Sequence, residues 1–302
     1  MRPGSAEAVV TVDGVARSGA RADGIHQIGS VTKVFTALVL AREVVDARLT
    51  LDQPVSELLP GLAGSPAGTA TLSALASHTS GLPRLPPGSW QKVWSAARRD
   101  PYADIDADAL VAALREVRLR RAGGRPAYSN LGYGLLGHAL ATHLGMSYDA
   151  AVSARVTRPL GMADTGCAPA DPARLVIGTN RWGRAHPQAW TFDAMAGAGA
   201  LWSTVDDLVV FLRAQLWPPD DGLGEAIRLT HRTLAGEGRI ALAMAWMRLS
   251  GRDGSLLWHN GGTAGYRSFV GVDHGRQRGV VVLGASDRSV DRRGMDLARG
   301  RA

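Results

Sequence analysis

The 302-residue sequence has a single cysteine and no long hydrophobic run. One cysteine, Cys167, excludes an intrachain disulfide and a cysteine-based metal cluster, and it indicates a reducing compartment. No apolar run approaches the roughly 20 residues of a membrane span, and residues 1–23 lack the apolar core of a signal peptide. We therefore expect a cytoplasmic protein with no membrane span.

Charged residues are also few, at 20% of the chain, whereas hydrophobic residues make up 45%. This balance, with glycine and proline scattered rather than periodic, excludes collagen, a coiled coil and a disordered chain. The length is sufficient to bury a sizeable core. The sequence therefore predicts a globular protein.

The formal net charge of +7 raises the question of a nucleic-acid partner. The arginines are spread along the chain, and the densest run, residues 115–121, has no interleaved aromatic residues and follows Asp104, Asp106 and Asp108. This pattern favours the solvated face of a helix. We expect no nucleic-acid partner.

Lysine is nearly absent: Lys33 and Lys92 are the two lysines among 34 basic residues. Each follows a serine by three positions, Ser30 and Ser89 respectively. Arginine stays protonated, whereas a buried lysine can lose its proton and act as a base. Either Ser-x-x-Lys pair is therefore a candidate nucleophile and base.

The first of these pairs lies where a strand gives way to a helix expected over residues 31–45. A serine there exposes its hydroxyl beside free backbone N–H groups, and Lys33 at i+3 lies on the same helix face as Ser30. The alternative is that Ser30 only caps the helix. Ser89 follows a proline-rich loop, and we interpret it as a helix cap and Lys92 as incidental.

Two further elements carry residues suited to acyl-transfer chemistry. Tyr128-Ser129-Asn130 precedes a helix; a phenol near a lysine ammonium can have a lowered pKa and shuttle a proton, although a simple turn and cap is the alternative. In His259-Asn260-Gly261-Gly262, the glycines would let a substrate approach the backbone, and the Gly262 N–H could complete an oxyanion site with that of Ser30. The alternative there is an ordinary glycine-rich hairpin.

The order of secondary structure predicts an α+β fold. A hairpin is expected over residues 8–18 around an Asp13-Gly14 turn, followed by a helical region at about 49–216. Strands are expected again at 240–249, 256–259, 266–272 and 279–284. The expected helices lie near 104–121, 131–144, 147–156 and 205–216. We therefore expect one domain over residues 1–302, with an antiparallel sheet from about 8–30 and 240–286 and the helical region inserted.

Taken together, Ser-x-x-Lys, Tyr-x-Asn and His-x-Gly in this order resemble the serine β-lactamase-like family of class C β-lactamases, D-alanyl-D-alanine carboxypeptidases, esterases and D-aminopeptidases. The resemblance extends to residues 26–37, 77–83, 128–137, 158–162, 199–208 and 259–262. It implies the β-lactamase/transpeptidase-like fold and a two-step acyl transfer on a small ester, amide or lactam.

The resemblance also implies roles for individual residues. Ser30 would be the nucleophile, and Lys33 and Tyr128 would take and relay its proton. Asn130 would hold Lys33 and a substrate amide. His259, Gly261 and Gly262 would bind substrate, with the Gly262 N–H at the oxyanion.

One departure from the family bears on the substrate. His259 stands where β-lactamases carry the lysine of Lys-Thr-Gly, and a histidine is mostly neutral at pH 7. This favours an esterase or D-aminopeptidase over an efficient β-lactamase. An acyltransferase that passes the acyl group to an alcohol or amine, and a non-catalytic binding protein, remain as alternatives.

Three other patterns are interpreted as structural. Gly132 to Gly137 matches a dinucleotide-binding pattern, but no strand precedes it, so helix packing explains these glycines better. His138 and His143 are five apart, which is the wrong spacing for a helical zinc pair. His78 is expected to stabilise its turn rather than perform chemistry. We expect no cofactor and no metal.

Overall fold

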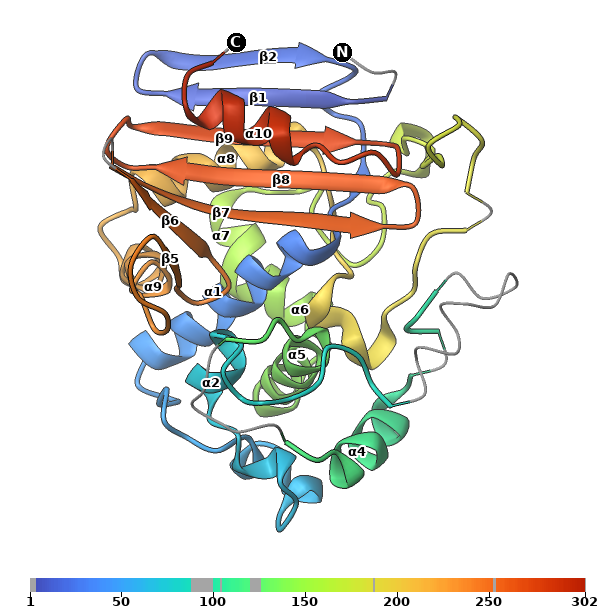
Figure 1. Cartoon of the computed structure of the whole chain (residues 1–302), viewed down its shortest axis with the longest axis vertical. Helices are drawn as coiled ribbons and strands as arrows, with labels where there is room; N and C mark the ends of the chain where they lie inside the picture. Colours follow the sequence, from blue (N-terminus) through green and yellow to red (C-terminus); the bar gives the residue numbers. More distant parts are fainter. Residues whose placement is uncertain are drawn as a thin grey trace.

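A seven-stranded antiparallel sheet, built from both ends of the chain, is the main feature of the computed structural model (Figure 1). The structure describes residues 4–87, 100–103, 105–119, 126–186, 188–251 and 254–301. The strands of the sheet are β1 (Ala6–Thr11), β2 (Gly14–Gly19), β5 (Ile240–Leu242), β6 (Met247–Gly251), β7 (Gly254–Thr263), β8 (Tyr266–Asp273) and β9 (Arg278–Gly284). Their order is β2-β1-β9-β8-β7-β6-β5, so the first strand pairs with the last. The expected fold, a sheet from both chain ends with a helical region inserted, is confirmed.

The strands differ from the expectation in three places. The hairpin turns at Val12 and Asp13, one residue early, because Gly14 already pairs with Thr11 as the first residue of β2. The stretch 240–249 forms two strands, β5 and β6, which reverse at Ala245 with a φ of 63°. Strand β7 continues past its expected end at residue 259, so the glycine-rich segment is paired strand rather than loop.

Nine α-helices lie in the described part of the chain. They are α1 (Thr32–Val45), α2 (Leu72–Ala76), α4 (Ala107–Glu116), α5 (Asn130–Leu144), α6 (Tyr148–Val152), α7 (Arg158–Leu160), α8 (Val205–Leu216), α9 (Gly222–Thr230) and α10 (Asp291–Ala298). None of these helices is long and apolar enough to cross a membrane.

Helix boundaries follow the capping residues. Asp106 accepts a hydrogen bond from the Ala109 N–H at 2.8 Å and begins α4, which is shorter than expected because the backbone is extended again at Val117. Helices α9 and α10 were missed by the periodicity analysis. Glycines inside both helices obscure the apolar pattern, although Asp221 caps α9 in the usual way.

The sheet is covered on both faces. Along β9, Val281 and Leu283 join the main core, whereas Val280 and Val282 join a second cluster beneath α10, as the two-residue period of a strand requires. Helix α8 packs against β9 and β1 in the main core, on the face opposite α10 (Figure 1). Helices α2, α4 and α5 of the inserted region lie beyond the β7 side of the sheet, and α1 runs along the boundary between the two parts (Figure 1).

Candidate active site

Ser30 and Lys33 meet at the start of α1. Ser30 lies in a short 3₁₀ turn, η1 (Gly29–Val31), and Lys33 lies in the first turn of the helix that follows. Lys33 Nζ is 3.0 Å from Ser30 Oγ and donates a second hydrogen bond to the Ala198 carbonyl oxygen at 2.6 Å. The lysine is fully buried, and this burial, with a smaller contribution from the positive charge of Arg84, lowers the pKa of Lys33 well below its usual value. A neutral amine is therefore favoured beside the serine hydroxyl.

Tyr128 lies just before α5, on the other side of the same hydroxyl. Its ring centroid is 5.0 Å from Lys33 Nζ, and its side chain is hydrogen-bonded to Ser30. Burial raises the pKa of Tyr128 to about 12, against the opposing effects of the Ser30 hydrogen bond and Arg84. The expected lowering of this pKa is wrong: desolvation dominates, and the buried lysine favours its uncharged form. The phenol is therefore a proton donor.

His78 holds the Tyr128 segment in place. Its Nδ1 accepts a hydrogen bond from the Ser129 N–H at 3.1 Å, and its carbonyl oxygen accepts one from the Ala127 N–H at 2.8 Å. The imidazole lies 4.6 Å from the Tyr128 ring, centroid to centroid. Burial lowers the pKa of His78, so it is neutral. These contacts fit the expectation that His78 has a structural role. They extend from its own turn to the Tyr128 segment.

Asn130 lines the cavity but does not hold Lys33. Its Nδ2 donates to the Tyr102 hydroxyl at 2.6 Å, and its buried Oδ1 has no hydrogen-bond partner among the described residues. The contact that we expected between Asn130 and the lysine is replaced by the Ala198 carbonyl. The free Oδ1 leaves Asn130 able to accept a hydrogen bond from a bound molecule.

Strand β7 passes directly against the serine turn. A Cβ at Gly29 would lie 2.8 Å from the Gly262 nitrogen, and a Cβ at Gly261 would lie 3.0 Å from the Ser30 nitrogen. A side chain at Gly261 would also overlap the Ile28 carbonyl oxygen and the Ser268 hydroxyl. Only glycine fits at these positions, and the close approach of the two backbones brings the nitrogens of Ser30 and Gly262 near each other.

His259 does not line the cavity, contrary to the expectation of substrate contact. Its side chain is buried on the main-core face of β7, with Nδ1 donating to the Asn260 carbonyl oxygen at 2.7 Å. Its ring lies 6.2 Å from that of Tyr128. Burial, with a smaller contribution from Lys33, lowers the pKa of His259 to about 3. The histidine is therefore neutral at pH 7.

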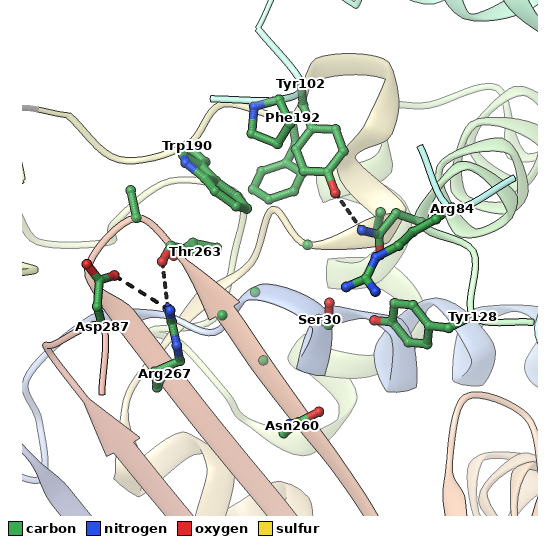
Figure 2. Close-up of a pocket in the computed structure, with 18 of the residues that line it drawn as sticks. Ser30, Arg84, Tyr102, Tyr128, Trp190, Phe192, Asn260, Thr263, Arg267 and Asp287 are labelled. Carbon is green, nitrogen blue, oxygen red and sulfur yellow. Dashed lines mark hydrogen bonds and ion pairs between the residues drawn. The ribbon is translucent and has the colours of Figure 1, made fainter. Parts of the chain in front are cut away.

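These elements border a cavity of about 940 Å³ (Figure 2). Ser30, Tyr128, Asn130, Gly261 and Gly262 line it, so the structure brings together the predicted residues other than Lys33 and His259 at its surface. Further lining residues were not identified from the sequence. They include Arg84, Tyr102, Trp190, Phe192, Asn260, Arg267 and Asp287.

One wall of the cavity is aromatic. The Tyr102 ring stacks on Phe192 with centroids 4.9 Å apart and meets Trp190 edge-on at 5.8 Å. Two chain segments supply these rings, one at residue 102 and one at residues 190–192, and no motif links them in the sequence. The wall provides an apolar surface opposite β7 (Figure 2).

The remaining patterns have structural explanations where they are described. A Cβ at Gly137 would lie 2.7 Å from Gly197 Cα, which confirms helix packing as the reason for that glycine. His143 is 3.5 Å from Glu43, and the described residues contain no cluster of His, Cys, Asp or Glu able to hold a metal ion. Ser89 and Lys92 lie outside the described residues.

Comparisons with known proteins agree with this geometry. Residues 2–302 match the family model for Beta-lactamase. The chain is 34% identical over 199 residues to the D-alanyl-D-alanine-carboxypeptidase/endopeptidase AmpH of Escherichia coli (strain K12), which covers 64% of this chain and 49% of that protein. It is 32% identical over 169 residues to Esterase EstB of Burkholderia gladioli, covering 52% of this chain and 42% of that protein. The chain thus spans about half the length of these relatives or less.

Solved structures give the same result over nearly the whole chain. A class C β-lactamase from Rhodobacter sphaeroides superimposes with a TM-score of 0.81 and 26% identity, covering 95% of this chain and 90% of that one. A β-lactamase from Sulfitobacter sp. EE-36 superimposes with a TM-score of 0.84 and 23% identity, covering 99% and 93%. The chain belongs to the β-lactamase family and has its β-lactamase/transpeptidase-like fold.

Proposed function

We propose that this protein is a serine hydrolase that forms an acyl-enzyme on small ester or amide substrates, with Ser30 as the nucleophile. The observation that carries the proposal is the 3.0 Å contact between Ser30 Oγ and the buried amine of Lys33. Because burial favours the neutral amine, Lys33 can accept the hydroxyl proton as the nucleophile attacks. The presence of Ser30, Lys33 and Tyr128 together at one site argues against a binding protein without activity.

The reaction has two steps. Ser30 Oγ bonds to the substrate carbonyl carbon while Lys33 takes its proton, and Tyr128 passes a proton to the leaving oxygen or nitrogen as the old C–O or C–N bond breaks. Lys33 then passes its extra proton to Tyr128, which restores both groups. Water attacks the acyl carbon and gives a proton to Lys33, and this proton passes to Ser30 Oγ as the ester bond breaks and the acid is released. The high pKa of Tyr128 suits it to donate and recover this proton without remaining ionised.

The backbone N–H groups of Ser30 and Gly262 would stabilise the tetrahedral intermediate. Their nitrogens lie at the contact between η1 and β7, where the glycines allow the two backbones to approach. Two donors fixed by strand pairing and a helix start need no rearrangement when the negative charge develops. Loss of one such donor typically lowers kcat by about 10²–10³-fold.

The chemistry around β7 favours esters and amides over β-lactams. His259 is neutral and buried, so β7 itself offers no positive charge. Arg267, on β8, lies beside Gly262 and is paired with Asp287. The aromatic wall of Tyr102, Trp190 and Phe192 offers an apolar surface instead. A carboxypeptidase and an esterase are among the relatives, and both activities are tested below.

Covalent labelling tests the nucleophile. A fluorophosphonate probe is expected to label the wild-type protein at Ser30, and the labelled peptide is identified by mass spectrometry. Ser30→Ala should abolish labelling and turnover of p-nitrophenyl esters. Ser289→Ala is the matched control, because Ser289 also lines the cavity and its hydroxyl accepts the Asp291 N–H, with no lysine beside it in the described part of the chain. Folded protein that is labelled at another serine, or not at all, would refute the proposal.

The substrate screen separates the open activities. We expect p-nitrophenyl ester turnover to exceed that of nitrocefin, with D-amino-acid amides included as peptidase substrates. Adding an alcohol or an amine during ester turnover tests for an acyltransferase. If the added alcohol or amine is acylated and correspondingly less free acid is released, the main reaction is acyl transfer rather than hydrolysis.

A further inference from the structure

Two arginines line the cavity among the described residues, and their charges are compensated differently. Arg267 donates to the carbonyl oxygens of Thr263 at 2.9 Å and Tyr266 at 2.7 Å, and its guanidinium lies 3.6 Å from the Asp287 carboxylate. Within the described chain, the Arg84 guanidinium has no carboxylate partner, and its neighbour is the Tyr128 ring at 5.6 Å. Among the described residues, Arg84 is therefore a cation at the cavity wall with no opposing charge.

Arg84 is fixed to the catalytic elements by its backbone. Its carbonyl oxygen accepts the N–H of Asn130 at 2.9 Å and that of Leu131 at 3.3 Å, at the start of α5. Its side chain extends over Tyr128 toward Ser30 (Figure 2). The same charge lowers the pKa values of Lys33 and Tyr128. The guanidinium is thus close enough to act on any group bound at the serine.

The opposite end of the cavity is acidic. Asp291 accepts a hydrogen bond from Asn260 at 3.0 Å, and Asp287 lies 3.0 Å from His186 and beside Arg267. Both aspartates line the cavity. Arg267 and Asp287 compensate each other, whereas Asp291 has no basic partner among the described residues. Because like charges repel, an anionic substrate is directed away from Asp291 and toward Arg84.

We propose that Arg84 binds a carboxylate of the substrate, so that the preferred substrates are esters or amides that also carry a free carboxylate. The guanidinium offers paired N–H donors that match a carboxylate, and it stands on the helical side of the cavity rather than on β7. The inference rests on the proposed hydrolase function, because it assigns a substrate class to that same site.

A pair of matched esters tests this proposal. p-Nitrophenyl hemiglutarate carries a carboxylate, and p-nitrophenyl pentanoate is its neutral counterpart with an acyl chain of equal length. The readout is the ratio of kcat/KM for the anionic ester to that for the neutral one. We expect Arg84→Gln to lower this ratio at least about tenfold, in line with loss of a hydrogen bond to a charged group, and Arg84→Lys to retain part of it.

Two controls separate charge recognition from other effects. Arg292→Gln removes the same charge from an exposed site on α10 and should leave the ratio unchanged. Continued turnover of the neutral ester by Arg84→Gln shows that the protein is folded. If both esters slow equally, Arg84 acts only by positioning or tuning Tyr128 and Lys33, and the proposal is wrong.

A binding measurement keeps this inference distinct from the hydrolase proposal. Monomethyl glutarate is titrated by NMR into Ser30→Ala protein and into the same protein with Arg84→Gln. Weaker binding to the second protein supports the Arg84 assignment even if neither ester is turned over, an outcome that would refute the hydrolase alone. Equal binding to the two proteins overturns the Arg84 assignment whatever the activity.

Discussion

The amine of Lys33 donates a hydrogen bond to the carbonyl oxygen of Ala198, 165 positions away in the sequence, at 2.6 Å. Ala198 ends a short 3₁₀ segment, η7 (Asp193–Ala198), that packs along α5. The acceptor is neutral, and no described carboxylate pairs with the amine. The fold therefore fixes the position of Lys33 without supplying the counter-charge that would keep it protonated.

Replacing Lys33 should make the protein more stable and inactive. We expect Lys33→Met to raise the free energy of unfolding at neutral pH by about 1–3 kcal/mol, because it removes a buried polar group with no charge partner. Ester turnover should fall at least about 100-fold with loss of the base. Urea denaturation followed by circular dichroism, together with the p-nitrophenyl ester assay, measures both effects.

The pH dependence of stability gives a second readout for the same variant. The pKa of Lys33 is lowered in the folded protein, whereas an unfolded lysine has a pKa near 10.4, so the unfolded chain binds more protons between these values. Wild-type stability thus gains from this group as pH rises toward about 10. Lys33→Met should lose that gain. Arg42→Met, on the same helix, is the control, and an equal pH slope in Lys33→Met and wild type would contradict the explanation.

Much of the fold follows from local sequence patterns. Alternating or continuous apolar residues located β1, β8 and β9, and the helical spacing after Ser30 located α1. The errors arose where glycine or tertiary pairing decided the outcome. Strand β7 extends through Gly261 and Gly262 because β8 pairs with it and η1 accommodates it, and neither neighbour is visible in the local pattern.

The site was predictable to the extent that it lies in short motifs. The Ser-x-x-Lys spacing places Lys33 beside Ser30 on one helix turn, and this needs no tertiary information. The sequence could not show that Ala198 would hold the lysine or that His259 would be buried away from the cavity. Arg84 was missed because its role depends on the cavity around it.

The His78 ring lies tilted against that of Tyr128, with centroids 4.6 Å apart, and this contact predicts a positioning role for His78. Two variants separate the ring contact from the hydrogen bond to Ser129. His78 has a φ of 59°, which asparagine tolerates well, and an asparagine oxygen can replace Nδ1 as acceptor for the Ser129 N–H. His78→Asn should therefore keep most of the stability but lose the ring beneath Tyr128. We expect kcat for ester turnover to fall about tenfold with KM little changed.

His78→Phe is the complementary variant. It keeps an aromatic ring but leaves the buried Ser129 N–H without its acceptor, so stability should fall by about 1–3 kcal/mol. Thermal unfolding and steady-state kinetics on both variants measure the two effects. If His78→Asn retains full kcat, the ring contact with Tyr128 has no part in the reaction.

Buried histidines should make the protein sensitive to acid. Burial lowers the pKa values of His231 and His259 to about 3, whereas an unfolded histidine has a pKa near 6.5. Between these values the unfolded chain binds more protons, so stability falls as pH is lowered. Each such group contributes a slope of up to about 1.4 kcal/mol per pH unit.

His231 allows this slope to be tested away from the cavity. It lies against Trp246 and is hydrogen-bonded to Gln215 at 2.9 Å. His231→Phe is expected to be less stable at neutral pH, because Gln215 loses its partner, yet to lose less stability between about pH 6 and pH 4 than the wild type does. Urea denaturation across this range gives the slope, and parallel curves for the two proteins would show that His231 does not titrate there.

Two glycines of α5 should respond to alanine by very different amounts. An alanine is normally favoured over glycine inside a helix by up to about 1 kcal/mol. At Gly132 the added Cβ would meet Ser129 Oγ at 3.3 Å, and this hydroxyl is held by hydrogen bonds to the Pro83 carbonyl oxygen and the Gly132 N–H. This tight contact offsets the gain in helix propensity, so Gly132→Ala should change stability by less than about 1 kcal/mol. At Gly137 the added Cβ would lie 2.7 Å from Gly197 Cα, a backbone atom that can move only if η7 moves, so Gly137→Ala should destabilise by about 1–3 kcal/mol.

Gly137→Ala should also reduce ester turnover, although Gly137 does not line the cavity. Displacing Gly197 shifts the adjacent Ala198 carbonyl, which holds the Lys33 amine beside Ser30. We expect Gly137→Ala to lower kcat under conditions where the protein remains folded, while Gly132→Ala retains wild-type kcat. Equal kcat for both variants would mean that the amine keeps its place without the Ala198 contact, and Ser30 together with the first turn of α1 would then be sufficient to position Lys33.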